Sequence, residues 1–129
     1  MIHRKIAAAL ADKLSTLALP TQYENSKFSP VAGQVYIAEK FLPGDTLAVG
    51  LAQTDDYGGI YQVTIMAPKD GGKGAALGTA QSVGNAFPRG LRMIREGVQV
   101  TILQTSQGPS FDVGDRYAIP VSVRWRAYA

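Results

Sequence analysis

Apolar side chains recur every three or four residues at the start of the chain, which is the spacing of one face of an α-helix. These positions are Ile2, Ile6, Leu10, Leu14 and Leu17. Pro20 follows them, and proline ends a helix because it lacks a backbone N–H and clashes with the preceding turn. The pattern predicts an amphipathic helix from about Ile2 to Leu17.

Four later segments alternate between apolar and polar residues, the two-residue period of a half-buried strand. They are residues 35–41, 57–66, 98–102 and 115–126. We expect the first segment to pair with the second, and the last to form the longest strand. Pro120 lies within the last segment and predicts an edge position or a bulge there, because proline cannot donate a hydrogen bond to a neighbouring strand.

A second helical pattern separates the second and third strand segments. Its shared face consists of Leu77, Ala80, Gly84 and Phe87, with Val83 beside them. The small residues on this face allow a helix to approach a sheet closely. The order of elements predicts an α+β fold: a mainly antiparallel or mixed sheet of about four to five strands, with two helices packed on one face.

Residues 42–56, with the sequence LPGDTLAVGLAQTDD, show no sustained period. Glycine, proline and acidic residues predict a long loop here, and loops of this length are usually functional or mobile. The apolar members of the segment are Leu47, Val49 and Leu51, and its last two residues are Asp55 and Asp56.

Composition limits the class of protein. The chain has 129 residues, of which 46% are hydrophobic, and this predicts one domain spanning residues 1–129. It has no cysteine, so disulfides and thiolate metal sites are excluded. The net charge of +3 comes without a basic block, which argues against sequence-specific nucleic-acid binding. Asp12 and Lys13 interrupt the N-terminal apolar run, so we expect neither a signal peptide nor a membrane segment, and synthesis in the cytoplasm.

One motif raises the question of phosphate binding. The sequence APKDGGKGAAL resembles a phosphate-binding loop that precedes a helix, but Ala67 replaces the required glycine and Gly74 the required hydroxyl residue. Asp70 would also repel a phosphate. We favour a helix-initiating turn in which Asp70 or a glycine caps free amides. A small phosphate- or nucleotide-binding module built on the KDGGKG turn is the alternative from another functional class.

Other candidate chemistry is sparse. His3 is the only histidine, and its place near the terminus predicts an exposed tail residue. Asp55 and Asp56 together with Asp45 or Glu39 offer oxygen ligands for a divalent cation, although paired acids in a polar loop are more often simply solvated. We assign no catalytic residue, no cofactor and no metal ligand, and predict that the protein is not an enzyme.

Five segments carry a resemblance to a known family. They are LPTQYENSKFSP after the first helix, QVYIAEKFLP, YGGIYQVTIMAP, the alanine-rich helix ending in NAFPRG, and QGPSFDVGDRYAIPVSVRWRA. Their order and spacing cover nearly the whole chain. In this layout the chain resembles the tail terminator (tail completion) proteins of long-tailed bacteriophages, related to the terminators of lambda-like siphophages.

The resemblance implies a structural protein of the virion tail. Such proteins form a homo-oligomeric ring, here expected to be a hexamer, that caps the tail tube, ends its polymerisation and provides the head-proximal joining surface. The implied partners are other copies of the chain, the phage tail tube protein and the head–tail connector protein. A head–tail joining or neck protein of similar size is the alternative within phage assembly.

Two groups of residues become candidate contacts under this resemblance. Leu47, Val49, Leu51, Asp55 and Asp56 lie in the segment that we assign to contact with the tube or a neighbouring subunit; the alternative is an ordinary flexible connector. The second group, on the polar side of the last strand, is Arg116, Arg124 and Arg126. We expect these arginines either to line the lumen, where DNA passes without being read, or to bridge to acids on the next subunit; the alternative is an ordinary solvated face.

Overall fold

The computed structural model describes residues 2–44, 47–49 and 54–128. Within them lie two helices, α1 (His3–Ser15) and α2 (Gly74–Ala86). The strands are β1 (Thr21–Gln22), β2 (Tyr36–Pro43), β3 (Leu47–Val49), β4 (Thr54–Pro68), β5 (Arg92–Arg95), β6 (Val98–Gln107), β7 (Phe111–Val113) and β8 (Arg116–Tyr128). Both predicted helices and all four predicted strands are present.

The strands of the described residues form one eight-stranded sheet with the order β1-β2-β4-β8-β6-β5, and β3 and β7 are added to β4 and β8. Only the β1–β2 pair is parallel. The α+β prediction is therefore confirmed, with more strands than the four to five expected. The additional strands, β1, β3, β5 and β7, contain two to four residues each, which is too short for a two-residue period to show in the sequence.

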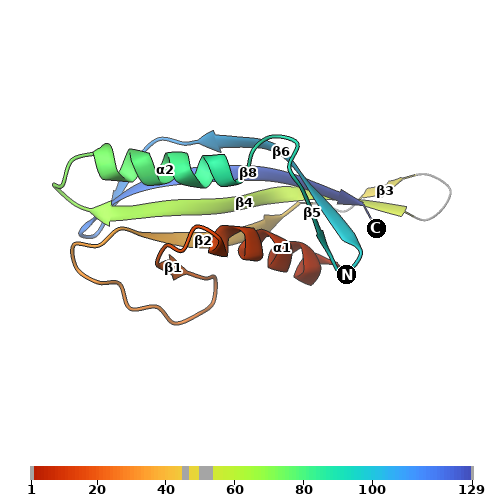
Figure 1. Ribbon diagram of the computed structural model, residues 1–129, viewed down its shortest axis with the longest axis horizontal. Coiled ribbons are helices and arrows are strands. Elements are labelled where there is room, and N and C mark those ends of the chain that lie inside the picture. The colour runs from red at the N-terminus through yellow and green to blue at the C-terminus, as the bar shows by residue number, and fades with distance from the viewer. Residues whose placement is uncertain (1, 45–46, 50–53, 129) are drawn as a thin grey trace.

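Two long antiparallel strands form the centre of the sheet. β4 and β8 pair without interruption from Asp56↔Tyr128 to Pro68↔Arg116, and Figure 1 shows them side by side along the long axis of the molecule. β4 has 15 residues and β8 has 13, so the expectation that the last strand is the longest was wrong. The predicted pairing of the strand at residues 35–41 with the strand at residues 57–66 is confirmed as β2–β4.

Both helices bury apolar side chains in one core with the sheet. In α1 the predicted face is confirmed, since Ile6, Leu10 and Leu14 are almost completely buried. In α2 the prediction was partly wrong: Leu77 is 37% exposed, and Ala76 takes the buried position. The remaining contacts of α2 with the core come from Ala80, Val83 and Phe87. The helix is rotated so that Ala76 and Ala80 face the sheet, and these small side chains let the helix and the strands approach closely.

The prediction of an edge position for Pro120 was wrong, because β8 lies between β4 and β6. The pairing of β6 ends at Gln107↔Val121, and that of β7 begins at Phe111↔Ala118. Pro120 therefore lies opposite the corner between these two strands, where its carbonyl oxygen accepts a hydrogen bond from the Gly108 N–H at 2.8 Å. The backbone N and O atoms of one strand residue point to the same side of the strand. The nitrogen of Pro120, which has no hydrogen to donate, therefore points to the corner between β6 and β7, where neither strand pairs with it.

The prediction of a long loop at residues 42–56 was also wrong for the part of the segment that is described. β2 extends to Pro43, and β3 pairs with residues 54–56 at the start of β4. Between these pairings the Gly44 N–H donates to the Gly58 carbonyl at 2.7 Å. The segment thus continues the sheet, and Figure 1 shows β3 at one end of the long axis, where both chain termini also lie. Leu51 lies outside the described residues.

Candidate assembly surface

Both described helices pack on one face of the sheet, and the other face carries neither of them. Antiparallel partners point to the same face, so the registers Ile60↔Arg124 and Gln62↔Ser122 place these side chains together on the face opposite the core. Gln104 and Ser106 of β6 extend the same rows. Arg124 and Arg126 are exposed there. We call this surface, made by the even-numbered residues of the central strands, the open face.

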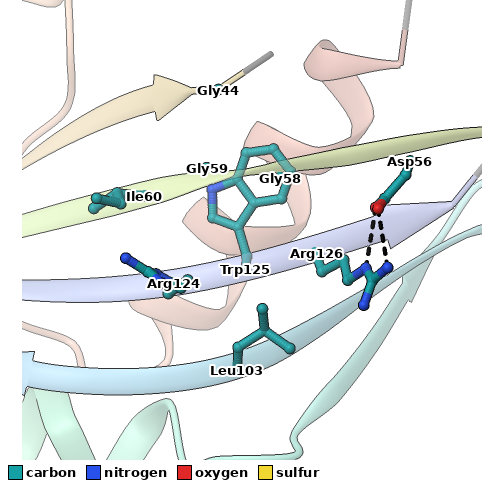
Figure 2. Close-up of a pocket in the computed structure, with 9 residues that line it drawn as sticks. All are labelled: Gly44, Asp56, Gly58, Gly59, Ile60, Leu103, Arg124, Trp125 and Arg126. Atoms are coloured by element: carbon teal, nitrogen blue, oxygen red, sulfur yellow. Dashed lines mark hydrogen bonds and ion pairs between the residues drawn. The ribbon is translucent and has the colours of Figure 1, made fainter. Parts of the chain in front are cut away.

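Arg126 forms an ion pair with Asp56 across the open face. Its Nε donates to Oδ1 at 3.1 Å and its Nη2 to Oδ2 at 2.9 Å, which is the bidentate geometry that favours arginine over lysine. The pair joins the start of β4 to the end of β8, as Figure 2 shows. One of the two acids assigned to tube contact is therefore already engaged within the subunit.

A hollow of about 440 Å³ lies beside this ion pair. It is lined by Gly44, Asp56, Gly58, Gly59, Ile60, Leu103, Arg124, Trp125 and Arg126. Gly58 leaves space here because it has no side chain, and an added Cβ atom would meet only the Trp125 carbonyl oxygen, at 3.8 Å. A register shift in β6 between Ile102 and Gln104 turns Leu103 outward, where it is 37% exposed. A second hollow is also lined by Arg126, and a third is also lined by Arg124. Each guanidinium group therefore lies between two adjacent hollows, and the linings of these hollows are partly polar and partly apolar.

Trp125 lies beneath the hollow and fixes the position of the strands. Its ring is fully buried and stacks on Phe41, with ring centroids 5.4 Å apart and planes at 7°. Gly59 faces the indole from β4, and a Cβ atom there would lie 2.8 Å from Cζ2 of Trp125 and 2.5 Å from the Leu42 carbonyl oxygen. Only glycine fits at this point without moving the backbone. The Gly58–Gly59 pair was visible in the sequence, but its function depends on the register with Trp125.

The structure separates Arg116 from the other two candidate arginines. Arg116 is 7% exposed. Its guanidinium lies 5.0 Å from the centre of the Tyr36 ring and donates to the carbonyl oxygens of Val31, at 2.9 Å, and Gln34. Arg116 therefore holds the segment before β2 against one end of the open face, about 26 Å along β8 from Arg124 at roughly 3.3 Å per residue.

The other predicted contact residues are distributed over the β3–β4 hairpin. Leu47 and Val49 belong to β3, and Asp55 precedes Asp56 in β4. The backbone register pairs Leu47 with Asp56 and Val49 with Thr54. The structure thus brings four of the five predicted loop contacts onto two paired strands, at the end of the sheet that also carries Arg126.

The KDGGKG turn connects β4 to α2, as expected for a turn that starts a helix. The expected capping by Asp70 or a glycine was wrong: the residue before the helix is Lys73, which makes no side-chain capping hydrogen bond. Asp70 instead adopts a positive φ of 65° within the turn. The adjoining hollow is lined by Asp70 and Asp112 as well as by Lys69 and Lys73. Two carboxylates beside two amines make this hollow a poor site for a phosphate.

Glu39 and His3, which the sequence raised as candidates, have partners within the protein. The Tyr61 hydroxyl donates to Glu39, and burial, followed by this hydrogen bond, raises the pKa of Tyr61 far above its usual range. His3 is half-buried, with its ring 5.5 Å from that of Tyr57, so the prediction of an exposed tail residue was wrong. Among the described residues no three His, Cys, Asp or Glu side chains cluster as metal ligands would.

Neither described helix is long and apolar enough to span a membrane, since each has 13 residues.

These features define a class of protein: a small α+β protein that buries two helices on one side of a sheet and exposes the other side as a polar, arginine-bearing surface. The chain belongs to the phage tail terminator protein family, whose model matches residues 5–125. It is thus related to structural components of the phage tail, which associate with other tail proteins in the virion.

The fold itself has been observed before. A solved structure superposes with a TM-score of 0.79 and 27% sequence identity, and the match covers 96% of this chain and 94% of that chain. No curated protein matches the sequence.

Proposed function

We propose that this protein forms a ring, with six copies as the expected number, that caps the phage tail tube, ends its polymerisation and provides the head-proximal joining surface. The observation that carries the proposal is the family match over residues 5–125. Head-to-tail contacts between identical subunits use two different surfaces, and they give a finite ring when the rotation closes. In this proposal residues 1–129 act as a single tail-terminator domain made in the host cytoplasm.

The open face is the surface that we assign to the lumen. Arg124 is exposed there, and the hydroxyl and amide groups of Ser122 and Gln62 lie beside it. The Asp56 carboxylate, which would repel DNA, is paired with Arg126. Guanidinium and amide groups interact with phosphates without reading bases, so passing DNA would be tolerated and not bound in a sequence-specific way. Arg116 is buried and therefore does not belong to this surface.

The β3–β4 hairpin is the part that we assign to the tail tube. It carries Leu47, Val49 and Asp55, and it lies at one end of the long axis (Figure 1). We assign Leu51, which lies outside the described residues, to the same contact. The ion pair of Asp56 with Arg126 fixes the base of the hairpin to β8. A contact at this end leaves the opposite end of the subunit available to the head–tail connector protein.

Electron microscopy of tails after deletion of the gene from its parent prophage tests the proposal. Overlong tubes without heads are expected, because polymerisation is no longer stopped. A plasmid copy of the wild-type gene should restore the normal length distribution. Tails of normal length that remain unattached to heads would refute termination and support a role in head–tail joining, and intact virions would refute both roles.

The assignment of the hairpin has a separate test. Leu47→Asp should leave the free energy of unfolding nearly unchanged and should block tail completion, because it places a charge on the surface assigned to the tube. Leu77→Asp is the matched control, since Leu77 is exposed on α2, away from the hairpin. Normal titres of infectious particles from Leu47→Asp would remove the hairpin from the contact with the tube.

A further inference from the structure

The sheet ends on one side in a short strand that has no neighbour among the described residues. This strand is β5, at the end of the strand order, and it pairs only with β6. Strand pairing uses alternate backbone groups, so the outer edge of β5 presents N–H and C=O groups that can pair with another chain. Ile94, at 73% exposure the most exposed large apolar side chain described, lies on this strand.

The charge of this edge is positive. Arg92 is exposed two residues before Ile94 and forms no ion pair among the described residues. Arg95 is paired with Asp12 of α1, which fixes the strand against that helix. The outer edge of β5 therefore combines unpaired backbone, one exposed apolar side chain and a cation whose charge is not neutralised.

The opposite side of the sheet ends in β1, and a hollow of about 290 Å³ lies beside it. Its lining comes from Gln22, Tyr23, Glu24, Asn25, Ala38, Glu39 and Lys40. The Glu24 carboxylate accepts the Phe41 N–H at 2.8 Å, and Glu39 accepts the hydroxyl of Tyr61. Glu39 also accepts the Glu24 N–H at 3.4 Å, so both of its oxygens are engaged. Among the described residues, the second oxygen of Glu24 accepts no hydrogen bond and is available to a further donor. Lys40 also lines the hollow.

We propose that the outer edge of β5 docks against the β1–β2 edge of a second copy of this chain, with Ile94 in the hollow beside Gln22 and the Arg92 guanidinium on the Glu24 carboxylate. This inference rests on the proposed ring. The two edges differ in shape and have opposite charge, so each copy offers one of each, as a head-to-tail contact requires. A contact between two β5 edges would instead bring the arginines together.

This arrangement also explains why both edges are short. β1 has two residues and β5 has four. Long unprotected edges promote uncontrolled aggregation, whereas short edges with charged residues limit pairing to a matched partner. Arg92 lies at the β5 margin of the open face, opposite Thr101, and lines a hollow together with Arg126. The contact therefore covers only this margin and leaves the rows over β4 and β8, and the β3–β4 hairpin, accessible for the roles assigned to them.

Disulfide trapping tests the contact directly, because the natural chain has no cysteine. The double variant Ile94→Cys with Gln22→Cys is introduced into the phage, and tails are isolated and oxidised with copper phenanthroline. A ladder of covalent multimers on a non-reducing gel is expected. The control is Leu103→Cys with Gln22→Cys, since Leu103 is also exposed, at 37%, but lies on β6, one strand inward from the edge. Control tails should yield only monomers.

Charge exchange supplies a second measurement. Arg92→Glu and Glu24→Arg should each lower the infectious titre at least tenfold, and the two changes together should restore it. Arg89→Glu, an exposed arginine outside β5, is the control.

Failure of the inference is distinguishable from failure of the proposed function. Tails of normal length that contain the cysteine variant but give no multimers would overturn the edge contact and leave tail termination intact. If deletion of the gene has no effect on tail length, the proposed role in tail termination is refuted. The edge contact is then refuted as well, because it rests on the proposed ring.

Discussion

The two ends of β8 carry the same residue type on the same face of one strand, in different environments. Arg116 at one end is buried, and its guanidinium is bonded to two backbone carbonyls and lies over a tyrosine ring. Arg124 and Arg126 at the other end are exposed beside open hollows. The difference comes from the segment before β2, which covers one end of the open face. The alternation of residues along a strand thus determines to which face of the sheet a side chain points. It does not determine whether another segment of the chain covers that side chain.

The largest expected effect separates these two ends. Arg116→Ala should lower the free energy of unfolding by about 3 kcal/mol, because it removes a buried guanidinium that donates to two backbone carbonyls and packs on the Tyr36 ring. Arg124→Ala should change it by less than about 0.5 kcal/mol, as is usual for an exposed residue. Urea unfolding followed by circular dichroism measures both values. Equal losses for the two variants would mean that burial does not distinguish the arginines.

The next effect concerns the floor of the hollow at the exposed end. Gly59→Ala should cost about 2 kcal/mol or more, since its Cβ meets backbone at 2.5 Å and a rigid indole at 2.8 Å. Gly58→Ala is the matched control, because the nearest atom to its Cβ is 3.8 Å away. The control should be neutral or slightly stabilising in the same urea titration. A Gly59→Ala protein of wild-type stability would show that the strands shift easily here.

A smaller effect tests another buried residue with a polar group, Tyr61, away from both arginine sites. The folded state holds the proton of Tyr61 more tightly than the unfolded chain, whose pKa is about 10. The stability from this group is therefore fully present below pH 10 and is lost as the pH rises from there toward the folded pKa.

Tyr61→Phe should cost about 1 kcal/mol at pH 7 through the lost hydrogen bond to Glu39. It should also weaken the decline of stability between pH 9.5 and 11 compared with the wild type. Thermal unfolding across this range measures both effects. Parallel pH curves for the two proteins would show that Tyr61 does not contribute to the alkaline loss.

The smallest effect is expected at the exposed ion pair. Asp56→Asn should lower the free energy of unfolding by only about 0.5 kcal/mol, because exposed pairs contribute little and are screened by salt. The loss should shrink further between 0.05 and 0.5 M NaCl. A cost as large as that of Arg116→Ala would show that the exposed end of β8 is stabilised in the same way as the buried end.

Much of the fold was predictable because secondary structure leaves a local signal. The apolar period in residues 2–17 located α1, and the alternation around Tyr61, Val63 and Ile65 identified the buried face of β4. The family resemblance was predictable for the same reason, since it depends on the order of these segments. The short strands were missed because two to four residues do not complete a recognisable period.

The candidate surface was predicted only in part. The direction of Arg124 and Arg126 followed from alternation, and the structure confirms it. The edge strand β5, with Ile94 and Arg92, left no signal that a two-residue period could reveal. The hollow beside Trp125 depends on a register that joins residues more than sixty positions apart.

The sequence by itself determined which residues share a side of each helix or strand, because that depends on backbone periods within a few neighbours. Only the tertiary structure decided which residues on the open face stay exposed, why Ala76 and not Leu77 faces the core, and how Pro120 is accommodated in an interior strand. Each of these outcomes depends on a segment distant in the chain that covers, rotates or interrupts the local element. Such contacts are set by packing of the whole core, and no local pattern encodes them.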